Sequence, residues 1–297
     1  MRHEMVSTVT QKAPPWDSQP LEAWAGQYAT GNLISIDGKQ THYVVKGSGK
    51  PVILIHGFFF DGTVWCHNLD ALAQSCRVYV LDLWGFGYSA RISQPSYELY
   101  SDQLAAFMQA LNIEKATLIG QSLGGGVAIQ FSVQFPGKVD KLVLVDTAGL
   151  PNPDPFSARF FKLKGVGEYL MAFPGNTIRQ KMLKDFFLFK PEAIPPALFR
   201  RLTWFQRIAG TSVAALALMR LGFADQLEAA LRRLAALDLP IMVVWGAQDR
   251  AIPLALGQRI HQMLPHSKFL IIPAAGHVPN LEQPALFNSQ VTAFLSE

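Results

Sequence analysis

The sequence predicts an α/β fold in which a mostly parallel β-sheet is covered by helices on both faces. Short β-rich segments alternate with longer segments of helical periodicity along most of the 297 residues, which is typical of this fold class. Several β-rich segments are continuous apolar runs, as expected of strands that are buried on both faces. The alternation is interrupted once, over residues 151–237, where only helical patterns occur. We therefore predict one sheet domain with a helical insertion.

Eight strands are expected, and they cover residues 32–36, 42–45, 51–55, 77–81, 116–119, 141–145, 240–245 and 268–272. A helix is predicted over residues 97–111, where apolar side chains recur at helical spacing, and another follows Pro284. The insertion follows the sixth strand, and prolines and glycines divide it into helical stretches. Residues 1–30 are predicted to be an N-terminal arm. Residues 31–150 and 238–297 are predicted to form the sheet domain, and residues 151–237 a helical cap.

The composition excludes several classes of protein. Hydrophobic residues make up 49% of the chain and charged residues 16%, which excludes a disordered chain. The mean hydropathy of +0.17 is high, but the longest candidate membrane segment, residues 213–219, ends at Arg220 and is far shorter than the roughly 20 residues of a span. The N-terminus lacks the apolar stretch of a signal peptide, which predicts a cytoplasmic protein. Cys66 and Cys76 are expected to be reduced, because a helix between them would hold them about 15 Å apart.

The predicted cap carries all of the net positive charge. Residues 151–236 contain 13 Lys+Arg and 6 Asp+Glu, together with 10 of the 20 phenylalanines. This pattern fits amphipathic helices with a buried apolar side and a solvated basic exterior. It also fits an apolar acyl pocket under a basic outer face that favours anionic substrates or transient contact with an anionic lipid surface. No recognition motif for nucleic acid accompanies the charge, so nucleic-acid binding is not expected.

The strongest local signal is a Gly-x-Ser-x-Gly pattern formed by Gly120, Ser122 and Gly124. It lies between the predicted strand 116–119 and a helical run over residues 125–135. Such a strand-to-helix turn is so sharp that only glycine fits beside the two elements, and it pushes the serine hydroxyl into the open. Ser122 is therefore the candidate nucleophile.

A serine hydroxyl needs a base to take its proton and an acid to orient that base. His277 follows the last predicted strand, and Asp249 follows the seventh. The order Ser122, Asp249, His277 is that of one known triad architecture. Asp146, at the end of the sixth strand, is a second candidate for the acid. No cluster of Cys, His and Asp has the spacing of metal ligands, so neither a metal nor another cofactor is predicted.

Two backbone N–H groups are expected to stabilise the negative charge that forms on a substrate oxygen. Phe58 follows His56-Gly57 after the third strand, and Leu123 follows the serine. Loss of one such donor costs about 2.7 to 4 kcal/mol in comparable enzymes. We expect His56 to support the turn rather than to take part in chemistry, and Asp82 to hold its own glycine turn.

Taken together, these motifs resemble the α/β-hydrolase fold with a helical cap, from residue 33 to the C-terminus. The motifs that carry the resemblance are His56-Gly57, Asp-Leu-Trp-Gly-Phe-Gly-Tyr-Ser at residues 82–89, the Ser122 turn, Trp-Gly-Ala-Gln-Asp at residues 245–249 and Gly276-His277. Trp84 departs from the proline that is frequent in the family. Relatives that open epoxides or displace halide attack through aspartate, so Ser122 argues against both activities.

The resemblance implies a cofactor-free serine hydrolase that cleaves a carboxylic ester with a hydrophobic acyl or alcohol part. Similar hydrolases cleave the carbon–carbon bond of ring-cleavage products or open lactones with the same triad, and perhydrolysis is a further variant. A small-molecule receptor on the same fold is the alternative outside the enzymes. The expected partner is thus a small hydrophobic ester. The sequence leaves open the oligomeric state and whether the arm packs on the domain or on a partner.

Overall fold

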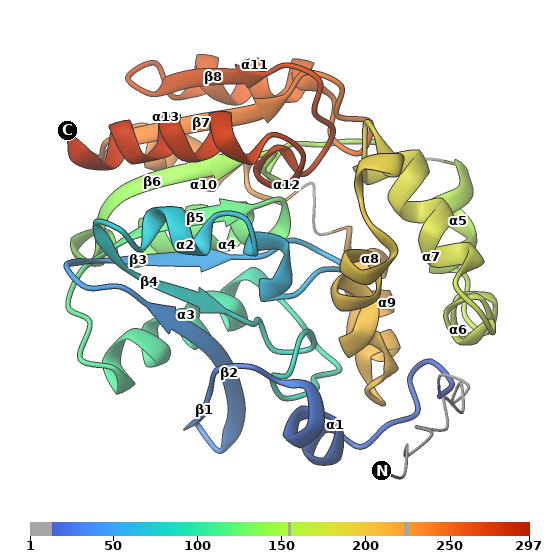
Figure 1. The fold of residues 1–297 in the computed structure, drawn as a ribbon. Coiled ribbons are helices and arrows are strands. Elements are labelled where there is room, and N and C mark those ends of the chain that lie inside the picture. The colour runs from blue at the N-terminus through green and yellow to red at the C-terminus, as the bar shows by residue number, and fades with distance from the viewer. Residues whose placement is uncertain (1–13, 154–155, 223–225) are drawn as a thin grey trace, which may run out of the picture.

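The computed structural model describes residues 14–153, 156–222 and 226–297. All eight predicted strands are present, in one sheet with the order β1-β2-β4-β3-β5-β6-β7-β8. The strands are β1 (Asn32–Ile36), β2 (Lys39–Lys46), β3 (Lys50–Ile55), β4 (Cys76–Leu81), β5 (Ala116–Gln121), β6 (Val139–Val145), β7 (Ile241–Gly246) and β8 (Lys268–Ile272). β2 runs antiparallel to β1 and β4, and all other neighbours are parallel. The parallel strands therefore end at one edge of the sheet (Figure 1).

The middle of the sheet is buried on both faces. Every residue of β5 and of β7 is buried, although their side chains point alternately to the two faces. This explains why β7 is a continuous apolar run over residues 241–245. The edge strands β1 and β8 contain exposed positions.

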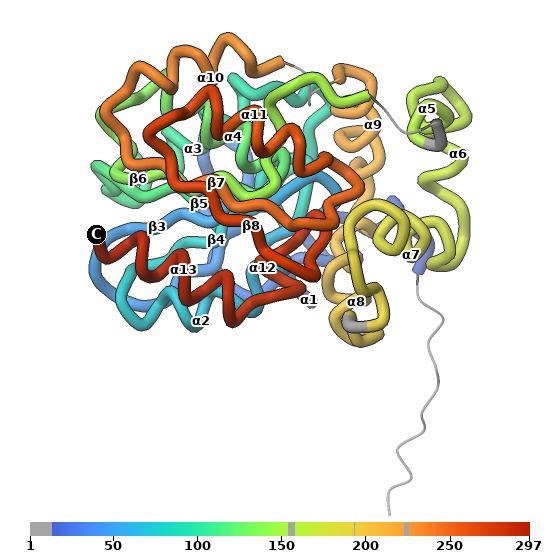
Figure 2. Tube along the Cα trace, turned by 90° about the horizontal axis from the view of Figure 1, so that it is seen from above, coloured from blue at the N-terminus to red at the C-terminus, as the bar shows by residue number. Residues whose placement is uncertain are grey.

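Helices cover the two faces in separate layers (Figure 2). One layer contains α3 (Tyr97–Ala110), α4 (Leu123–Gln134), α10 (Glu228–Leu234) and α11 (Leu254–Met263). The other contains α2 (Leu69–Leu72), α12 (Pro279–Glu282) and α13 (Pro284–Ser296). The predicted helix over residues 97–111 is α3, and the side chain of Ser96 caps its N-terminus by accepting a hydrogen bond from the Leu99 N–H. The 3-10 turns η1 (Gly62–Trp65) and η2 (Pro136–Lys138) complete this part.

Between β6 and α10, the described residues form helices that lie beyond the edge where the parallel strands end (Figure 1). They are α5 (Phe156–Lys162), α6 (Val166–Ala172), α7 (Thr177–Met182), α8 (Pro196–Thr203) and α9 (Thr211–Leu221), with the short turns η3 (Leu183–Phe187), η4 (Pro191–Ala193) and η5 (Trp204–Arg207). We call α5 to α9 and these turns the cap helices. α10 packs on α4 instead, and the division into domains stays a prediction. In the described part of the chain, no helix is long and apolar enough to cross a membrane.

The described part of the N-terminal arm, from residue 14 onward, packs on the cap helices. The ring of Trp16 lies between two guanidinium groups, 3.6 Å from that of Arg179 and 3.9 Å from that of Arg207. The backbone N–H groups of Ser18 and Gln19 donate to the carbonyl of Arg207. The helix α1 (Leu21–Tyr28) follows, and its buried Trp24 packs on the cap helices at η5.

Cys66 and Cys76 are free thiols, as predicted.

Candidate active site

Ser122 lies in a strained turn between β5 and α4. Its φ of 53° and ψ of −115° place a residue with a side chain in a region that is costly for it. A Cβ atom at Gly120 would lie 2.3 Å from the carbonyl oxygen of Gly124, and one at Gly124 would lie 2.3 Å from that of Ile55. Both glycines are therefore required for the turn. The backbone N–H of Ser122 donates to Val145 at 2.9 Å, which anchors the turn to β6.

His277 and Asp249 form a buried hydrogen-bonded pair. The distance between Nδ1 of His277 and Oδ2 of Asp249 is 2.7 Å. The other carboxylate oxygen of Asp249 accepts the backbone N–H groups of Ala251 and Ile252 at 2.8 and 3.0 Å. Both carboxylate oxygens of Asp249 thus accept hydrogen bonds, which fixes the side chain. Because Nδ1 of His277 is used in this pair, Nε2 is the nitrogen that could act on a substrate or a nucleophile.

The serine turn and the histidine loop are joined by a direct contact. The side-chain amide of Gln121 donates to the carbonyl of His277 at 2.8 Å. Gln121 precedes Ser122, so this bond fixes the histidine loop relative to the nucleophile. A Cβ atom at Gly57 would lie 3.0 Å from the Cβ of Ser122, and the turn after β3 therefore also lies against the serine.

That turn is held by His56. Its Nδ1 lies 2.8 Å from the carbonyl of Gly57, and its Nε2 accepts the backbone N–H of Leu83 at 3.0 Å. Complete burial lowers the pKa of His56, which keeps the imidazole neutral and suits its role as an acceptor. His56 thus joins the ends of two neighbouring strands. The two N–H groups predicted to bind an oxyanion belong to Phe58, in this turn, and to Leu123, the first residue of α4.

Asp146 lies next to the pair formed by Asp249 and His277. It is fully buried, and its Oδ1 accepts the N–H of Gly246 at 2.9 Å. Burial, with the charge of Asp249 adding to it, raises the pKa of Asp146 well above its usual range. The raised pKa favours the protonated form of Asp146, and the hydrogen bond from the imidazole of His277 goes to Asp249. The three side chains each offer one atom that could bind a metal ion, and these atoms lie within 4.8 Å of one another.

The cap helices touch the histidine directly. The backbone N–H of His277 donates to the carbonyl of Phe187 at 2.8 Å, and the Phe187 ring stacks on the imidazole with centroids 5.5 Å apart. Glu282 joins the same segments, because its carboxylate accepts the N–H groups of Gly276, Phe189 and Lys190 at 2.6, 2.8 and 3.0 Å. The cap segment after η3 and the histidine loop therefore form one hydrogen-bonded unit.

Sequence reasoning did not identify Gln121, Phe187 and Glu282. Gln121 lies inside the Gly-x-Ser-x-Gly pattern, and Glu282 lies five residues after His277. Their closeness in sequence to predicted site residues could have identified them as candidates. Nothing distinguishes Phe187 from the other phenylalanines of the insertion.

A family model described as "alpha/beta hydrolase fold" matches residues 50–284 of the chain. The chain is 33% identical over 287 residues to the dihydrolipoyllysine-residue acetyltransferase component of the acetoin cleaving system of Cupriavidus necator, covering 93% of this chain and 71% of that protein. It is 29% identical over 276 residues to 2-hydroxymuconate semialdehyde hydrolase of Pseudomonas sp., covering 90% and 94%. An esterase structure from Thermogutta terrifontis aligns with a TM-score of 0.76 at 27% identity, covering 90% of this chain and 98% of that one.

Proposed function

The chain belongs to the α/β hydrolase fold family, and from this premise we propose that it is a serine hydrolase that cleaves carboxylic esters with a hydrophobic acyl or alcohol part. The observation that carries the proposal is the hydrogen-bonded pair of His277 and Asp249, tied through Gln121 to the strained Ser122 turn. A serine nucleophile requires a histidine base that an acid orients in this way, which supports the proposal.

The reaction follows from the roles of these groups. The Oγ of Ser122 attacks the ester carbonyl while Nε2 of His277 takes its proton, and Asp249 stabilises the resulting imidazolium. The N–H groups of Phe58 and Leu123 donate to the oxyanion. His277 then protonates the departing alcohol, leaving an acyl group on Ser122. Water, deprotonated by His277, attacks the acyl carbon, and the serine takes back the proton as the acid leaves.

Apolar side chains support the preference for a hydrophobic substrate. Phe58, which carries one predicted oxyanion donor, packs edge-on against Phe59 with centroids 4.5 Å apart. On the other side of the site, Phe187 covers the imidazole of His277. Such surroundings favour apolar ligands with a few polar contacts.

The experiment compares the wild type with Ser122→Ala and with Ser289→Ala, an exposed serine on α13. We expect turnover of p-nitrophenyl esters and labelling by a fluorophosphonate to be lost in the first variant and unchanged in the second. Retained turnover in Ser122→Ala would refute the proposal. Labelling without turnover of any ester in a broad panel would favour a small-molecule receptor.

Carbon–carbon bond hydrolysis is the second candidate, because the similarity to 2-hydroxymuconate semialdehyde hydrolase covers 94% of that protein. The same triad would serve, so the substrate decides. The values of kcat/KM distinguish ester, lactone and carbon–carbon bond hydrolysis. The substrates to compare are an acyl-length series of p-nitrophenyl esters, a lactone and a ring-cleavage dienone. A maximum at intermediate acyl length supports the esterase, and a much higher value for the dienone or the lactone supports that activity.

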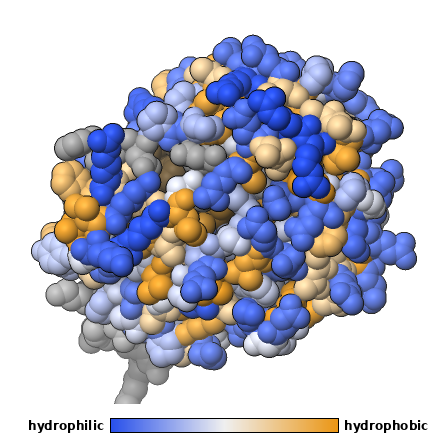
Figure 3. Space-filling view, turned by 180° about the vertical axis from the view of Figure 1, so that it is seen from behind, coloured by the Kyte–Doolittle hydropathy of each residue, from blue (hydrophilic) through white to orange (hydrophobic). Residues whose placement is uncertain are grey.

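We also propose that α5 and α6 contact anionic lipid surfaces. Large apolar side chains there are between 39% and 66% exposed, namely Phe160, Leu163, Val166, Tyr169 and Phe173. Arg159, Lys162 and Lys164 lie among them in the sequence. Figure 3 shows apolar and strongly hydrophilic side chains side by side at the left, where the cap helices lie. Exposed apolar side chains with adjacent cations suit a membrane interface.

Vesicle sedimentation tests this surface. We expect binding to phosphatidylglycerol vesicles, little binding to phosphatidylcholine vesicles, and loss of binding in Leu163→Glu. Leu33→Glu on β1, where the leucine is 52% exposed, is the matched control and should bind like the wild type. Equal binding by Leu163→Glu would refute the lipid contact. The expected cytoplasmic location stays a prediction.

A further inference from the structure

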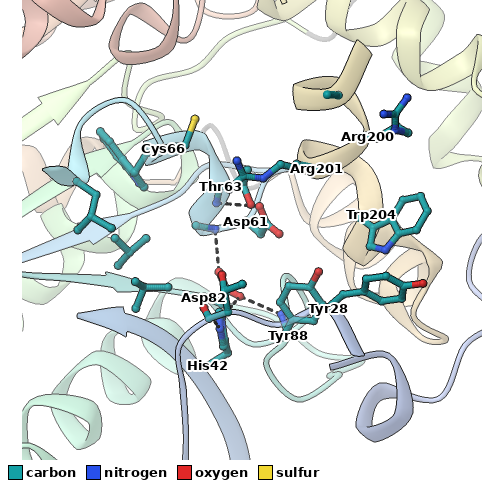
Figure 4. Close-up of a pocket in the computed structure, with 17 residues that line it drawn as sticks. Tyr28, His42, Asp61, Thr63, Cys66, Asp82, Tyr88, Arg200, Arg201 and Trp204 are labelled. Carbon is teal, nitrogen blue, oxygen red and sulfur yellow. Dashed lines mark hydrogen bonds and ion pairs between the residues drawn. The ribbon is translucent and has the colours of Figure 1, made fainter. Parts of the chain in front are cut away.

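A cavity of about 470 Å³ lies between the sheet, the cap helices and the arm. Figure 4 shows its walls, which come from β2, β4, the segment around η1, the helix α8, and Tyr28 of α1. The lining residues do not include Ser122, Asp249 or His277. The volume is within the range of roughly 300 to 1,000 Å³ that is typical of small-molecule sites.

Two guanidinium groups border this cavity. Arg200 and Arg201 lie on α8, on the cap side. Neither guanidinium forms an ion pair or hydrogen bond with another group in the described ranges. The positive charge of Arg201 acts on Cys66 and on Tyr88, which also line the cavity. Both arginines are exposed, so the cavity is bordered by solvated cations that have no protein anion as a partner within the described residues.

The negative charge of the cavity wall is largely neutralised. Asp82 contacts Nδ1 of His42 at 2.7 Å and accepts the backbone N–H groups of Gly62 and Tyr88 at 2.8 and 2.9 Å. The last bond confirms that Asp82 holds its own turn. Asp61 has one oxygen bonded to the N–H of Thr63 at 2.9 Å. Burial and the charge of Asp82 raise the pKa of Asp61 to about 7, so its carboxyl group is protonated in much of the population near neutral pH.

Aromatic side chains form part of the cavity wall. The ring of Tyr28 packs edge-on against Trp204 with centroids 5.3 Å apart. The indole N–H groups of Trp65 and Trp204 have no hydrogen-bond partner within the described residues, but they are buried and are not open to the cavity. The cavity therefore combines cations with aromatic rings.

We propose that this cavity is a binding site, separate from Ser122, for a small aromatic carboxylate. The carboxylate would pair with Arg201, and the ring would lie against Tyr28 and Trp204. A cationic ligand fits less well, because Asp82 is already paired with His42 and two arginines line the cavity. The proposal is independent of the hydrolytic activity.

Isothermal titration calorimetry tests the site with three probes that share one ring system: 2-naphthoate, 2-naphthylmethanol and 2-naphthylmethylammonium. We expect saturable one-to-one binding of 2-naphthoate and weaker binding of the other two. Arg201→Gln should weaken 2-naphthoate binding by at least about tenfold, because a charge-assisted bond is lost.

Two control variants locate the bound probe. Arg159→Gln makes the same charge change at an exposed position of α5 outside the cavity, and His277→Ala alters the proposed catalytic site. Both should bind 2-naphthoate like the wild type, and a thermal melt of each variant establishes that it is folded. Absence of binding, equal affinity in Arg201→Gln, tighter binding of the ammonium probe, or loss of binding in His277→Ala would each overturn the proposal.

Discussion

Substitution by asparagine should affect kcat very differently at the two buried carboxyl groups beside His277. Asp249 accepts the Nδ1 hydrogen bond at 2.7 Å and is held by two backbone N–H groups. Asp146 is fully buried, and burial raises its pKa well above the usual range, which favours its neutral form. Asparagine has nearly the same shape as either side chain, and the substitution therefore tests charge and proton direction alone.

The expected magnitudes differ by orders of magnitude. Asp249→Asn places an amide where the imidazole needs an acceptor, which holds the histidine in the wrong tautomer. In a comparable triad this costs about 10⁴-fold in kcat, or about 5.5 kcal/mol. Asp146→Asn places a neutral amide where burial already favours the neutral form of the carboxyl group. Its amide oxygen can still accept the N–H of Gly246, and its NH₂ can donate to Asp249, so we expect less than about a tenfold change in kcat.

The assay is kcat for p-nitrophenyl butyrate, with urea unfolding of each variant to show that it is folded. A large loss in Asp146→Asn with little loss in Asp249→Asn would refute the reasoning and make Asp146 the acid of the triad. Similar losses in both would show that the two carboxyl groups share the role.

Three further predictions concern stability and the histidine loop. The unfolded chain releases the proton of Asp146 above about pH 4, whereas the folded protein keeps it to higher pH. The free energy of unfolding of the wild type relative to Asp146→Asn should therefore fall as the pH rises towards the folded pKa. Urea unfolding measures this difference at each pH, and a constant difference would contradict the prediction. Gly124→Ala should lower the free energy of unfolding by several kcal/mol, because its Cβ would lie 2.3 Å from a backbone oxygen of β3. Gly137→Ala is the control: a Cβ there meets nothing within 4 Å, and the change should cost less than about 1 kcal/mol. Glu282→Gln weakens three charge-assisted bonds from backbone N–H groups and should lower both the free energy of unfolding, by about 1–3 kcal/mol, and kcat. Glu98→Gln on the exposed face of α3 is the control, and equal behaviour of the two variants would contradict the role of Glu282.

The strands could be predicted because a buried strand requires apolar residues close together in the sequence. β7 begins with five apolar residues, 241–245, and β5 is buried along its whole length; both strands lie where they were predicted. The candidate site was predictable in part for a similar reason. Ser122, Asp249 and His277 each follow a strand, and parallel strands bring such positions to the same edge.

Long-range contacts between irregular segments could not be predicted in this way. Trp16 packs on cap residues more than 160 positions further along the chain. Glu282 bonds to Phe189 across 93 positions. Neither contact has a periodicity or a spacing rule, since each depends on how the cap helices return to the sheet. The indole N–H groups of Trp65 and Trp204, unpaired within the described residues, could not be predicted from the sequence either. Whether a donor has a partner depends on the groups that surround it in the fold.

The cap helices and the proposed catalytic base share contacts that a simple cover over the site would lack. The carbonyl of Phe187 accepts the N–H of His277, and its ring stacks on the imidazole. Glu282 holds the following cap residues to the same loop. Displacement of this segment, such as substrate entry beneath it would require, would break or strain bonds that orient the histidine. Substitutions in this cap segment should therefore alter the orientation of His277 and its proton transfer, and they should change kcat as well as KM.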